Sequence, residues 1–457
     1  MNPVVRQKIA DFEEQGVPEV FERDLDLGTP HDPVRGNLVA LVTGVRRCGK
    51  TYRLYQEMNR IRQMHPRVPI LYFNFEDERL KPFQASLLSE VLDTFFAIHP
   101  EAKEMGAYLF FDEIQEVPEW GMFLRRLVDT EKATIYVTGP SSRMLSADMA
   151  TEFRGRSLTR EMWPMSWSEY LRFHDVADAR GLSRASALSS ATAAKLRNAL
   201  SGYLTRGGFI DPQRLGTQDA IRLQQEYALH TVNMDVIERY GLKIPVVAAQ
   251  FLSRCLASSG RELSINKAAE QLKQAGVRTS RTTLSNLLSY YEESYFLFSV
   301  AELSHSLSEN PRAVSKVYDV DPGMLVAFSP AGVVDEGQRL ETVVFNQLRR
   351  ERGGLRQGAI ARLLVREGSK QNEVDFARGD PLTGDAYELV QVSVSMEEAK
   401  TRKRELDGLQ AAMRQKGLPE GWVVTTDESE ELDVPEGRIH VVPAWRWLLG
   451  EEGGLEN

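Results

Sequence analysis

The chain has 457 residues, which exceeds the size of one hydrophobic core, so we expect about two to four domains. With 42% hydrophobic and 26% charged residues and no apolar run of membrane-spanning length, we expect a globular protein without a membrane partner. A net charge of −9 argues against non-specific coating of nucleic acid but allows a local basic face. Two cysteines, Cys48 and Cys255, and a charged N-terminus without secretion-signal features favour a reduced, cytoplasmic setting.

The first strong motif is a glycine-bounded loop. Residues 1–34 are expected to form an N-terminal helical segment, and an apolar run at 38–42 then leads into GVRRCGKT. In this pattern backbone N–H groups converge on phosphate oxygens, Lys50 reaches the β and γ phosphates, and the Thr51 hydroxyl binds Mg²⁺. Helical apolar spacing follows the loop, as this chemistry requires. We therefore predict ATP and Mg²⁺ as cofactors, with nucleotide contacts from Gly44, Val45, Arg46, Arg47, Cys48, Gly49, Lys50, Thr51 and Tyr52.

An acidic pair completes the predicted site. The apolar run 108–111 ends in Asp112 and Glu113, which places two carboxylates at the C-terminal end of a buried strand. We expect Asp112 to hold the Mg²⁺ shell together with Thr51, and Glu113 to orient and deprotonate the attacking water. An acidic strand-to-loop junction is the alternative, which the glycine loop upstream disfavours.

Polar and basic residues follow the third predicted strand, residues 134–137. Thr138 or Ser141 can sense the γ-phosphate from there. Arg154 and Arg156 come next, and arginines at this place either solvate the surface or reach the nucleotide of a neighbouring subunit. The residues alone leave both alternatives open.

The order of GVRRCGKT, LFFDEIQEVPEW, TGPSSRMLS, FRGRS and MWPMSWSEYLRF resembles a prokaryotic family of AAA+-type ATPases. That family carries an uncharacterised, restriction-endonuclease-like C-terminal domain, and the resemblance covers nearly the whole chain. It implies ATP hydrolysis with Lys50 and Glu113 as catalytic residues, and it implies that Arg156 and Arg154 act between subunits. If Arg156 acts in trans, we expect a homo-oligomer such as a hexameric ring. The family usually has serine in place of Pro140, which leaves the γ-phosphate sensor open.

The middle of the chain predicts a helical lid and a winged helix-turn-helix. Residues 166–245, after an ATPase domain at 35–165, have helical spacing and resemble the lid of the same ATPases. In residues 246–310, Ser264 can cap one helix, Ser280 or Thr279 a second, and Gly276 makes the turn between them. An apolar strand pattern follows at 295–300, which completes the motif.

The second of these helices carries the predicted DNA contacts. Between Ser264 and Ser289, four Lys and Arg residues against one Glu give a local charge of +3. A helix that enters the major groove needs hydrogen-bonding side chains near its N-terminus. We predict duplex or branched DNA as a partner, with packing between subunits as the alternative use of this module. The predicted contacts are Arg278, Ser280, Arg281 and Thr282.

Residues 311–457 resemble a restriction-endonuclease-like core. Such a core holds Mg²⁺ with a helix glutamate, a strand aspartate and a third strand residue, here Glu341, Asp375 and Gln391, beside a lysine. Ser393 occupies the position of that lysine and cannot replace the cation. Lys400 or Lys403 could take the role, but both are more simply explained as a solvated helix face. We therefore predict a degenerate nuclease site whose domain serves binding or assembly.

These elements predict an α/β protein: a P-loop AAA+ ATPase core with helical lid, a winged helix-turn-helix and a C-terminal α/β nuclease-like domain. The leading hypothesis is an ATP-hydrolysing oligomer that acts on DNA in processing, mobile-element or defence contexts. A nucleotide-switched regulatory protein with a protein partner and an ATP-regulated nuclease are the alternatives.

Overall fold

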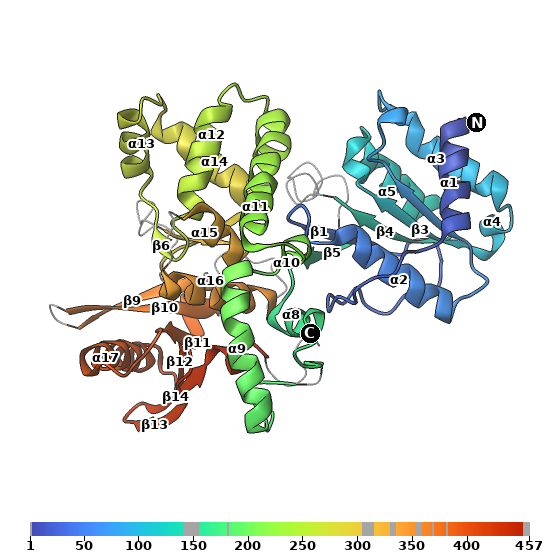
Figure 1. Ribbon diagram of the computed structural model, residues 1–457. Coiled ribbons are helices and arrows are strands. Elements are labelled where there is room, and N and C mark those ends of the chain that lie inside the picture. The colour runs from blue at the N-terminus through green and yellow to red at the C-terminus, as the bar shows by residue number, and fades with distance from the viewer. Residues whose placement is uncertain are drawn as a thin grey trace. The chain divides into compact units, whose positions relative to one another are not determined.

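The computed structural model describes residues 2–139, 155–180, 182–303, 315–329, 335–351, 359–367, 370–380 and 383–450. The chain folds into two compact units, Met1–Trp163 and Pro164–Asn457 (Figure 1). Within the described ranges, every helix is too short or too polar to cross a bilayer. The predicted site residues Ser141 and Arg154, and also Pro140, lie outside the described residues.

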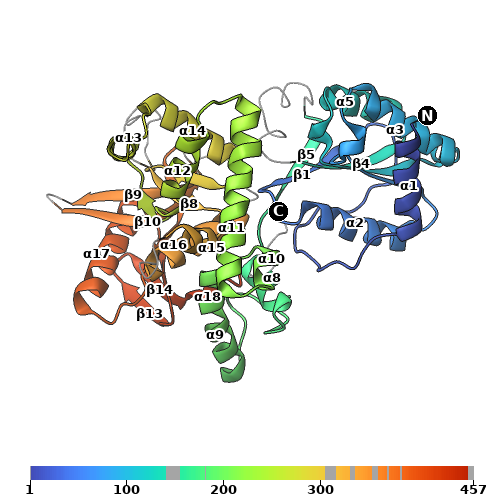
Figure 2. The same ribbon diagram turned by 45° about the horizontal axis from the view of Figure 1, so that its top comes forward.

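A five-stranded parallel sheet forms the centre of the N-terminal unit, in the order β2-β3-β4-β1-β5. Every residue of β3 and β4 is buried, which explains their almost unbroken apolar sequence, because helices cover both faces of a parallel sheet. Helix α2 lies on one face, with α3 and α5 on the other (Figure 2). The strands are β1 (Val39–Gly44), β2 (Ile70–Asn74), β3 (Ala107–Asp112), β4 (Ala133–Thr138) and β5 (Ser157–Met162).

The helices of this unit begin and end at recognisable signals. The helix predicted after the glycine loop is confirmed as α2, which buries Leu54, Met58 and Ile61 at helical spacing. The segment predicted as helical over 1–34 is helical only in α1, because Gly16 at φ +71° ends the helix and the chain then runs without regular structure to β1. The helices are α1 (Pro3–Gln15), α2 (Lys50–Met64), α3 (Ser86–Ile98), α4 (Ala102–Met105) and α5 (Trp120–Thr130), with short 3₁₀ turns η1 (Glu78–Leu80) and η2 (Ile114–Glu116).

The C-terminal unit begins with a run of helices. Ser166 caps the first of them in a capping box with Glu169. Near its end, α11 continues into a π-helical segment. The elements are α8 (Trp167–Phe173), α9 (Ser190–Arg206), α10 (Ile210–Gln213), α11 (Thr217–Thr231) and η3 (Val232–Glu238).

A three-stranded antiparallel sheet with three helices comes next. As predicted, the hydroxyl groups of Ser264 and Ser280 cap α13 and α14 by accepting hydrogen bonds from backbone N–H groups in the first turn of each helix. Gly276 lies between the two helices at φ +82°. The sheet has the order β6-β8-β7. The elements are α12 (Pro245–Leu256), β6 (Arg261–Glu262), α13 (Ile265–Gln274), α14 (Arg281–Glu293), β7 (Leu297–Val300) and β8 (Lys316–Asp319).

The chain ends in a six-stranded mixed sheet with the order β13-β14-β12-β11-β10-β9. Strands β9, β10 and β11 are antiparallel neighbours, whereas β11, β12 and β14 run parallel. The buried side of α17 packs against this sheet (Figure 1). The elements are α15 (Pro322–Phe328), α16 (Glu336–Glu351), β9 (Ile360–Glu367), β10 (Lys370–Asp380), β11 (Asp385–Val392), α17 (Ala399–Lys416), β12 (Glu420–Thr425), β13 (Glu430–Val434), β14 (Gly437–Pro443) and α18 (Ala444–Trp447).

Candidate functional site

The glycine loop connects the C-terminal end of β1 with the first turn of α2. Gly44 needs its missing side chain, because a Cβ there would lie 2.1 Å from the carbonyl oxygen of Met162 on β5. Arg47 and Gly49 adopt left-handed φ values of +68° and +101°. Turns of this kind turn successive N–H groups toward one side and create a concavity that attracts anions. The loop therefore has the backbone conformation that phosphate binding requires.

Lys50 is folded back onto its own loop. Its Nζ atom lies 3.2 Å from the Gly44 carbonyl oxygen and 3.1 Å from that of Val45. The side chain is almost fully buried, so its ammonium group depends on these two acceptors. A phosphate group that enters the loop can replace both carbonyl oxygens as partners of the ammonium group.

Asp112 ends β3 and is fully buried at the centre of a hydrogen-bond network. The Tyr72 hydroxyl and the Asn74 amide donate to its Oδ2 atom over 2.9 and 3.1 Å, and the Thr138 hydroxyl donates to Oδ1. Burial raises the pKa of Asp112, and the charge of Glu113 raises it further. A carboxylate in this position is stabilised by any cation that binds beside it.

Thr51 and Asp112, the two predicted Mg²⁺ ligands, lie near each other in the structure. The Thr51 hydroxyl is close enough to the Asp112 carboxylate to favour its charged form, which partly opposes the rise in the pKa of Asp112 that burial causes. A hydroxyl and a carboxylate are oxygen ligands of the kind that Mg²⁺ prefers, and they leave positions for phosphate oxygens and water. The residues therefore fit the predicted ion.

Glu113 follows Asp112 at a left-handed φ of +53°. Its backbone N–H donates to the Thr138 hydroxyl over 3.2 Å, so Thr138 contacts both acids. The side chain of Gln115 donates to Glu113 Oε2 over 2.6 Å. The Glu113 carboxylate is thus held by a neighbour in the chain. The role of Thr138 as γ-phosphate sensor stays a prediction.

Arg23 is a contributor to the loop that sequence patterns did not identify. It lies in the segment between α1 and β1, is 5% exposed, and donates to the carbonyl oxygens of Cys48 and Trp163, both over 2.8 Å. Its backbone N–H and C=O pair with the side-chain amide of Gln56 on α2. A buried guanidinium group therefore ties the glycine loop to the end of β5.

Arg156 directly precedes β5, at the N-terminal ends of the strands, whereas the glycine loop follows the C-terminal end of β1. Strand β5 runs parallel to β1, with Ser157 beside Val39 and Met162 beside Gly44. Arg156 forms an ion pair with Asp129 at 2.6 Å and is partly exposed. It is therefore remote from the glycine loop of its own chain.

The predicted DNA contacts lie at the N-terminal end of α14. Arg278, Arg281 and Thr282 are exposed. The Ser280 hydroxyl caps the helix, accepting the Thr283 N–H over 3.1 Å. Ser280 is thus committed to capping, whereas the other three side chains remain accessible.

The predicted nuclease-like residues also lie close together. Glu341 on α16 and Asp375 on β10 both contact Lys316, and Gln391 on β11 accepts the Asp375 N–H over 3.3 Å. Lys400 and Lys403 are exposed on α17, as their interpretation as a solvated face predicts. Lys316 precedes the predicted motif by many residues, and no local pattern pointed to it.

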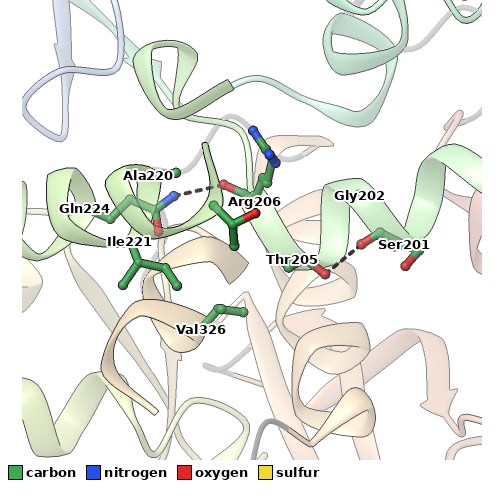
Figure 3. Close-up of a pocket in the computed structure, with 9 residues that line it drawn as sticks. Ser201, Gly202, Thr205, Arg206, Ala220, Ile221, Gln224 and Val326 are labelled. Atoms are coloured by element: carbon green, nitrogen blue, oxygen red, sulfur yellow. Dashed lines mark hydrogen bonds between the residues drawn. The ribbon is translucent and has the colours of Figure 1, made fainter. Parts of the chain in front are cut away.

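A cavity of about 230 Å³ lies between α9, α11 and α15 (Figure 3). The Gln224 side chain donates to the Arg206 carbonyl oxygen over 2.9 Å, and Thr205 donates to Ser201 over 2.8 Å. The Arg206 guanidinium group donates to the Leu215 carbonyl oxygen over 2.8 Å. Of these three bonds, only the one from Gln224 joins α11 to α9, since the bond of Thr205 lies within α9 and that of Arg206 reaches the loop before α11. We assign no ligand to the cavity.

Residues 36–171 match a family described as an AAA domain, and residues 197–334 match a domain of unknown function, DUF8612. A Methanocaldococcus jannaschii protein named "Uncharacterized protein MJ1544" is 31% identical over 439 residues, covering 94% of this chain and 91% of its own length. The chain belongs to the family of MJ1544. A Haemophilus influenzae protein named "Uncharacterized protein" is 23% identical over 368 residues, covering 79% of this chain and 83% of its own length.

Two solved structures share a weaker likeness. The Walker-type ATPase PABY2304 of Pyrococcus abyssi is 14% identical, with a TM-score of 0.41, and the match covers 71% of this chain and 95% of that chain. The Aeropyrum pernix ORC1 protein in complex with DNA is 13% identical, with a TM-score of 0.28, covering 71% and 90% of the two chains. With TM-scores below 0.5, these two structures carry no argument about this protein.

Proposed function

We propose that the N-terminal unit binds ATP with Mg²⁺ and hydrolyses it. The proximity of Thr51, in the first turn of α2 after the glycine loop, to Asp112 at the end of β3 carries this proposal, because it brings the glycine loop and the acidic pair into one site. The match of residues 36–171 to an AAA domain supports it independently. Mg²⁺, when bound, would neutralise charge that develops on the phosphate oxygens.

In this proposal each side chain has a distinct task. Lys50 leaves the carbonyl oxygens of Gly44 and Val45 and binds the β and γ phosphates. Glu113 orients a water molecule and accepts its proton, which requires that its carboxylate be released from Gln115. Arg23 keeps the loop in its phosphate-binding conformation through its hydrogen bond to the Cys48 carbonyl oxygen.

We further propose that Arg156 acts on the nucleotide of a neighbouring subunit in a homo-oligomer, with Arg154 as a second candidate. Arg156 lies at the N-terminal ends of the strands and the glycine loop at their C-terminal ends. This separation favours action in trans over action in its own chain. A head-to-tail contact of this kind closes into a ring or extends into a filament. We propose the closed ring, with a hexamer as one form.

DNA is the proposed partner of the C-terminal unit. The connectivity α12-β6-α13-α14-β7-β8, with β8 between β6 and β7, supports a winged helix-turn-helix. The exposed Arg278, Arg281 and Thr282 lie where a recognition helix contacts bases and phosphates. The test is an ATPase assay with duplex, single-stranded and branched DNA, in which the proposal requires stimulation and salt-sensitive binding.

A nucleotide-switched regulatory protein with slow hydrolysis is the second candidate. The bond between Gln115 and Glu113 favours it, because a restrained catalytic base slows turnover while it leaves ATP binding intact. The same assay separates the two, since a regulatory protein binds ATP without any response to DNA.

A further inference from the structure

Lys316, the first residue of β8, lies among three carboxylates from two other elements. Its Nζ atom lies 3.0 Å from Glu341 Oε1, 2.9 Å from Glu373 Oε1 and 3.1 Å from Asp375 Oδ1. Glu341 belongs to α16, whereas Glu373 and Asp375 both lie on β10. The contacts with Glu341 and Asp375 are hydrogen bonds, and the contact with Glu373 is an ion pair.

Lys316, Glu341 and Asp375 are largely shielded from water, whereas the Glu373 side chain is partly exposed. Lys316 is 9% and Asp375 8% exposed, and Tyr318 donates to Glu341 Oε1 over 2.6 Å. Burial alone would lower the pKa of Lys316, but the charges of Asp375, Glu341 and Glu373 outweigh it and raise the pKa. Lys316 therefore remains charged at neutral pH. Removing one partner of such a buried ion cluster leaves the others uncompensated.

Asp375 and the neighbouring Gln391 form further hydrogen bonds at the site. The second oxygen of Asp375 accepts the Val392 N–H over 3.0 Å. Gln391 accepts the Asp375 N–H through Oε1 and donates through Nε2 to Glu405 over 2.7 Å. The Gln391 amide is therefore held between Asp375 and Glu405.

A divalent cation does not fit this arrangement. Mg²⁺ and Mn²⁺ need several oxygen ligands at about 2.0 to 2.3 Å around one centre, and here the shared centre of the carboxylates is held by Lys316. Among the residues that the structure describes, no group of three acidic, His or Cys side chains is arranged to hold a metal ion. The restriction-endonuclease resemblance implies a metal ion at this position, but the side chains present do not fit a metal ion.

We infer that the Lys316 ammonium group is a built-in cation that takes the place of a divalent metal ion at Glu341, Glu373 and Asp375. The site is thus a latent metal site, which the lysine keeps closed. The ammonium group also ties β8, the central strand of the three-stranded sheet, to β10 of the six-stranded sheet. This inference is independent of ATP hydrolysis.

Mn²⁺ binding to the full-length, nucleotide-free protein tests this directly, with free Mn²⁺ followed by electron paramagnetic resonance. We compare the wild type with Lys316→Ala, Asp375→Asn and the double variant. We expect Lys316→Ala to bind one additional Mn²⁺ ion and the double variant to lose it. We also expect Mn²⁺ to raise the melting temperature of Lys316→Ala only, because the ion replaces the missing charge. Lys316→Arg is the matched control, since it keeps a positive charge beside the carboxylates and should leave the site closed.

Two results would overturn the inference. One is a Mn²⁺ ion on the wild type that Asp375→Asn removes, which shows that the metal and the lysine bind together. The other is a folded Lys316→Ala protein that binds no more Mn²⁺ than the wild type. If Lys316→Ala does not fold with or without Mn²⁺, the comparison of wild type with Asp375→Asn still decides, because equal Mn²⁺ binding by both supports the closed site.

Discussion

Gln115 holds the carboxylate of Glu113, with 2.6 Å between Nε2 and Oε2. The two residues lie on the short turn that follows β3, and the left-handed backbone of Glu113 directs them toward each other. The Glu113 carboxylate has to give up this hydrogen bond before it can accept a proton from a water molecule in the same place. The acid best placed to activate water is therefore restrained in the nucleotide-free protein.

Replacement of Gln115 by Leu should raise the basal rate of ATP hydrolysis. Loss of one hydrogen bond to a charged group corresponds to about 1.5 kcal/mol or more, so we expect a kcat increase of about tenfold. Steady-state phosphate release measures it, and Glu113→Gln is the inactive control. A lower kcat with unchanged ATP affinity would show instead that Gln115 positions Glu113 productively.

Replacement of Arg23 by Lys should weaken ATP binding although it keeps the positive charge. An ammonium group cannot bridge the carbonyl oxygens of Cys48 and Trp163 as the guanidinium fork does. We expect the Kd for ATP to rise about tenfold, equivalent to about 1.4 kcal/mol. Arg60→Lys is the matched control, because Arg60 also donates to a carbonyl oxygen of the same segment, that of Gly28, but lies at the surface. Equal affinity of Arg23→Lys and wild type would exclude the proposed role.

The stability of the C-terminal unit should depend on pH through Asp321. Burial raises the pKa of this carboxyl to about 6, although the N–H groups of Gly208 and Gly323 oppose the shift. A raised folded-state pKa means that the contribution to stability is present below about pH 4 and is lost as the pH rises through about 6.

Urea unfolding between pH 4 and pH 7.5 measures this effect against Asp321→Asn, which does not titrate. At about 1.4 kcal/mol per pKa unit, the stability difference between wild type and variant should shrink by about 3 kcal/mol as the pH rises. A difference that stays constant over this range would contradict the assignment to Asp321.

Replacement of Arg281 by Ala should weaken DNA binding without changing basal ATP hydrolysis. Loss of one phosphate contact should reduce the slope of log K against log salt by about 1. Arg222→Ala is a suitable control, because Arg222 is 73% exposed on α11, away from α14. Identical salt slopes for Arg281→Ala and wild type would remove α14 from the proposed DNA surface.

Local patterns predicted the parts of the site that lie in single segments. The glycine loop, the acid pair after β3 and the caps of α13 and α14 each depend on a few consecutive residues, and their placements are confirmed. The partners of these residues come from elsewhere. Tyr72 and Asn74 reach Asp112 only because β2 lies beside β3, and a single sequence does not give the strand order.

Lys316 illustrates the same limit in the C-terminal unit. The sequence pattern predicts Glu341, Asp375 and Gln391 on a helix and two strands, where the structure places them, but it indicates a lysine only near Gln391. The lysine that contacts the acids comes from β8, which belongs to a different sheet. Lys316 lies far from Asp375 and Gln391 in the sequence, so no local pattern indicates it. Only the packing of the two sheets brings Lys316 to the carboxylates.

ATP binding tests the central claim most directly. Calorimetric titration of the nucleotide-free, Mg²⁺-saturated protein with ATP should detect one site per chain in the wild type. In Lys50→Ala, binding should be strongly weakened and hydrolysis absent, while the thermal unfolding transition remains. Absence of nucleotide uptake by the folded wild type, or equal turnover by wild type and Lys50→Ala, would contradict the account.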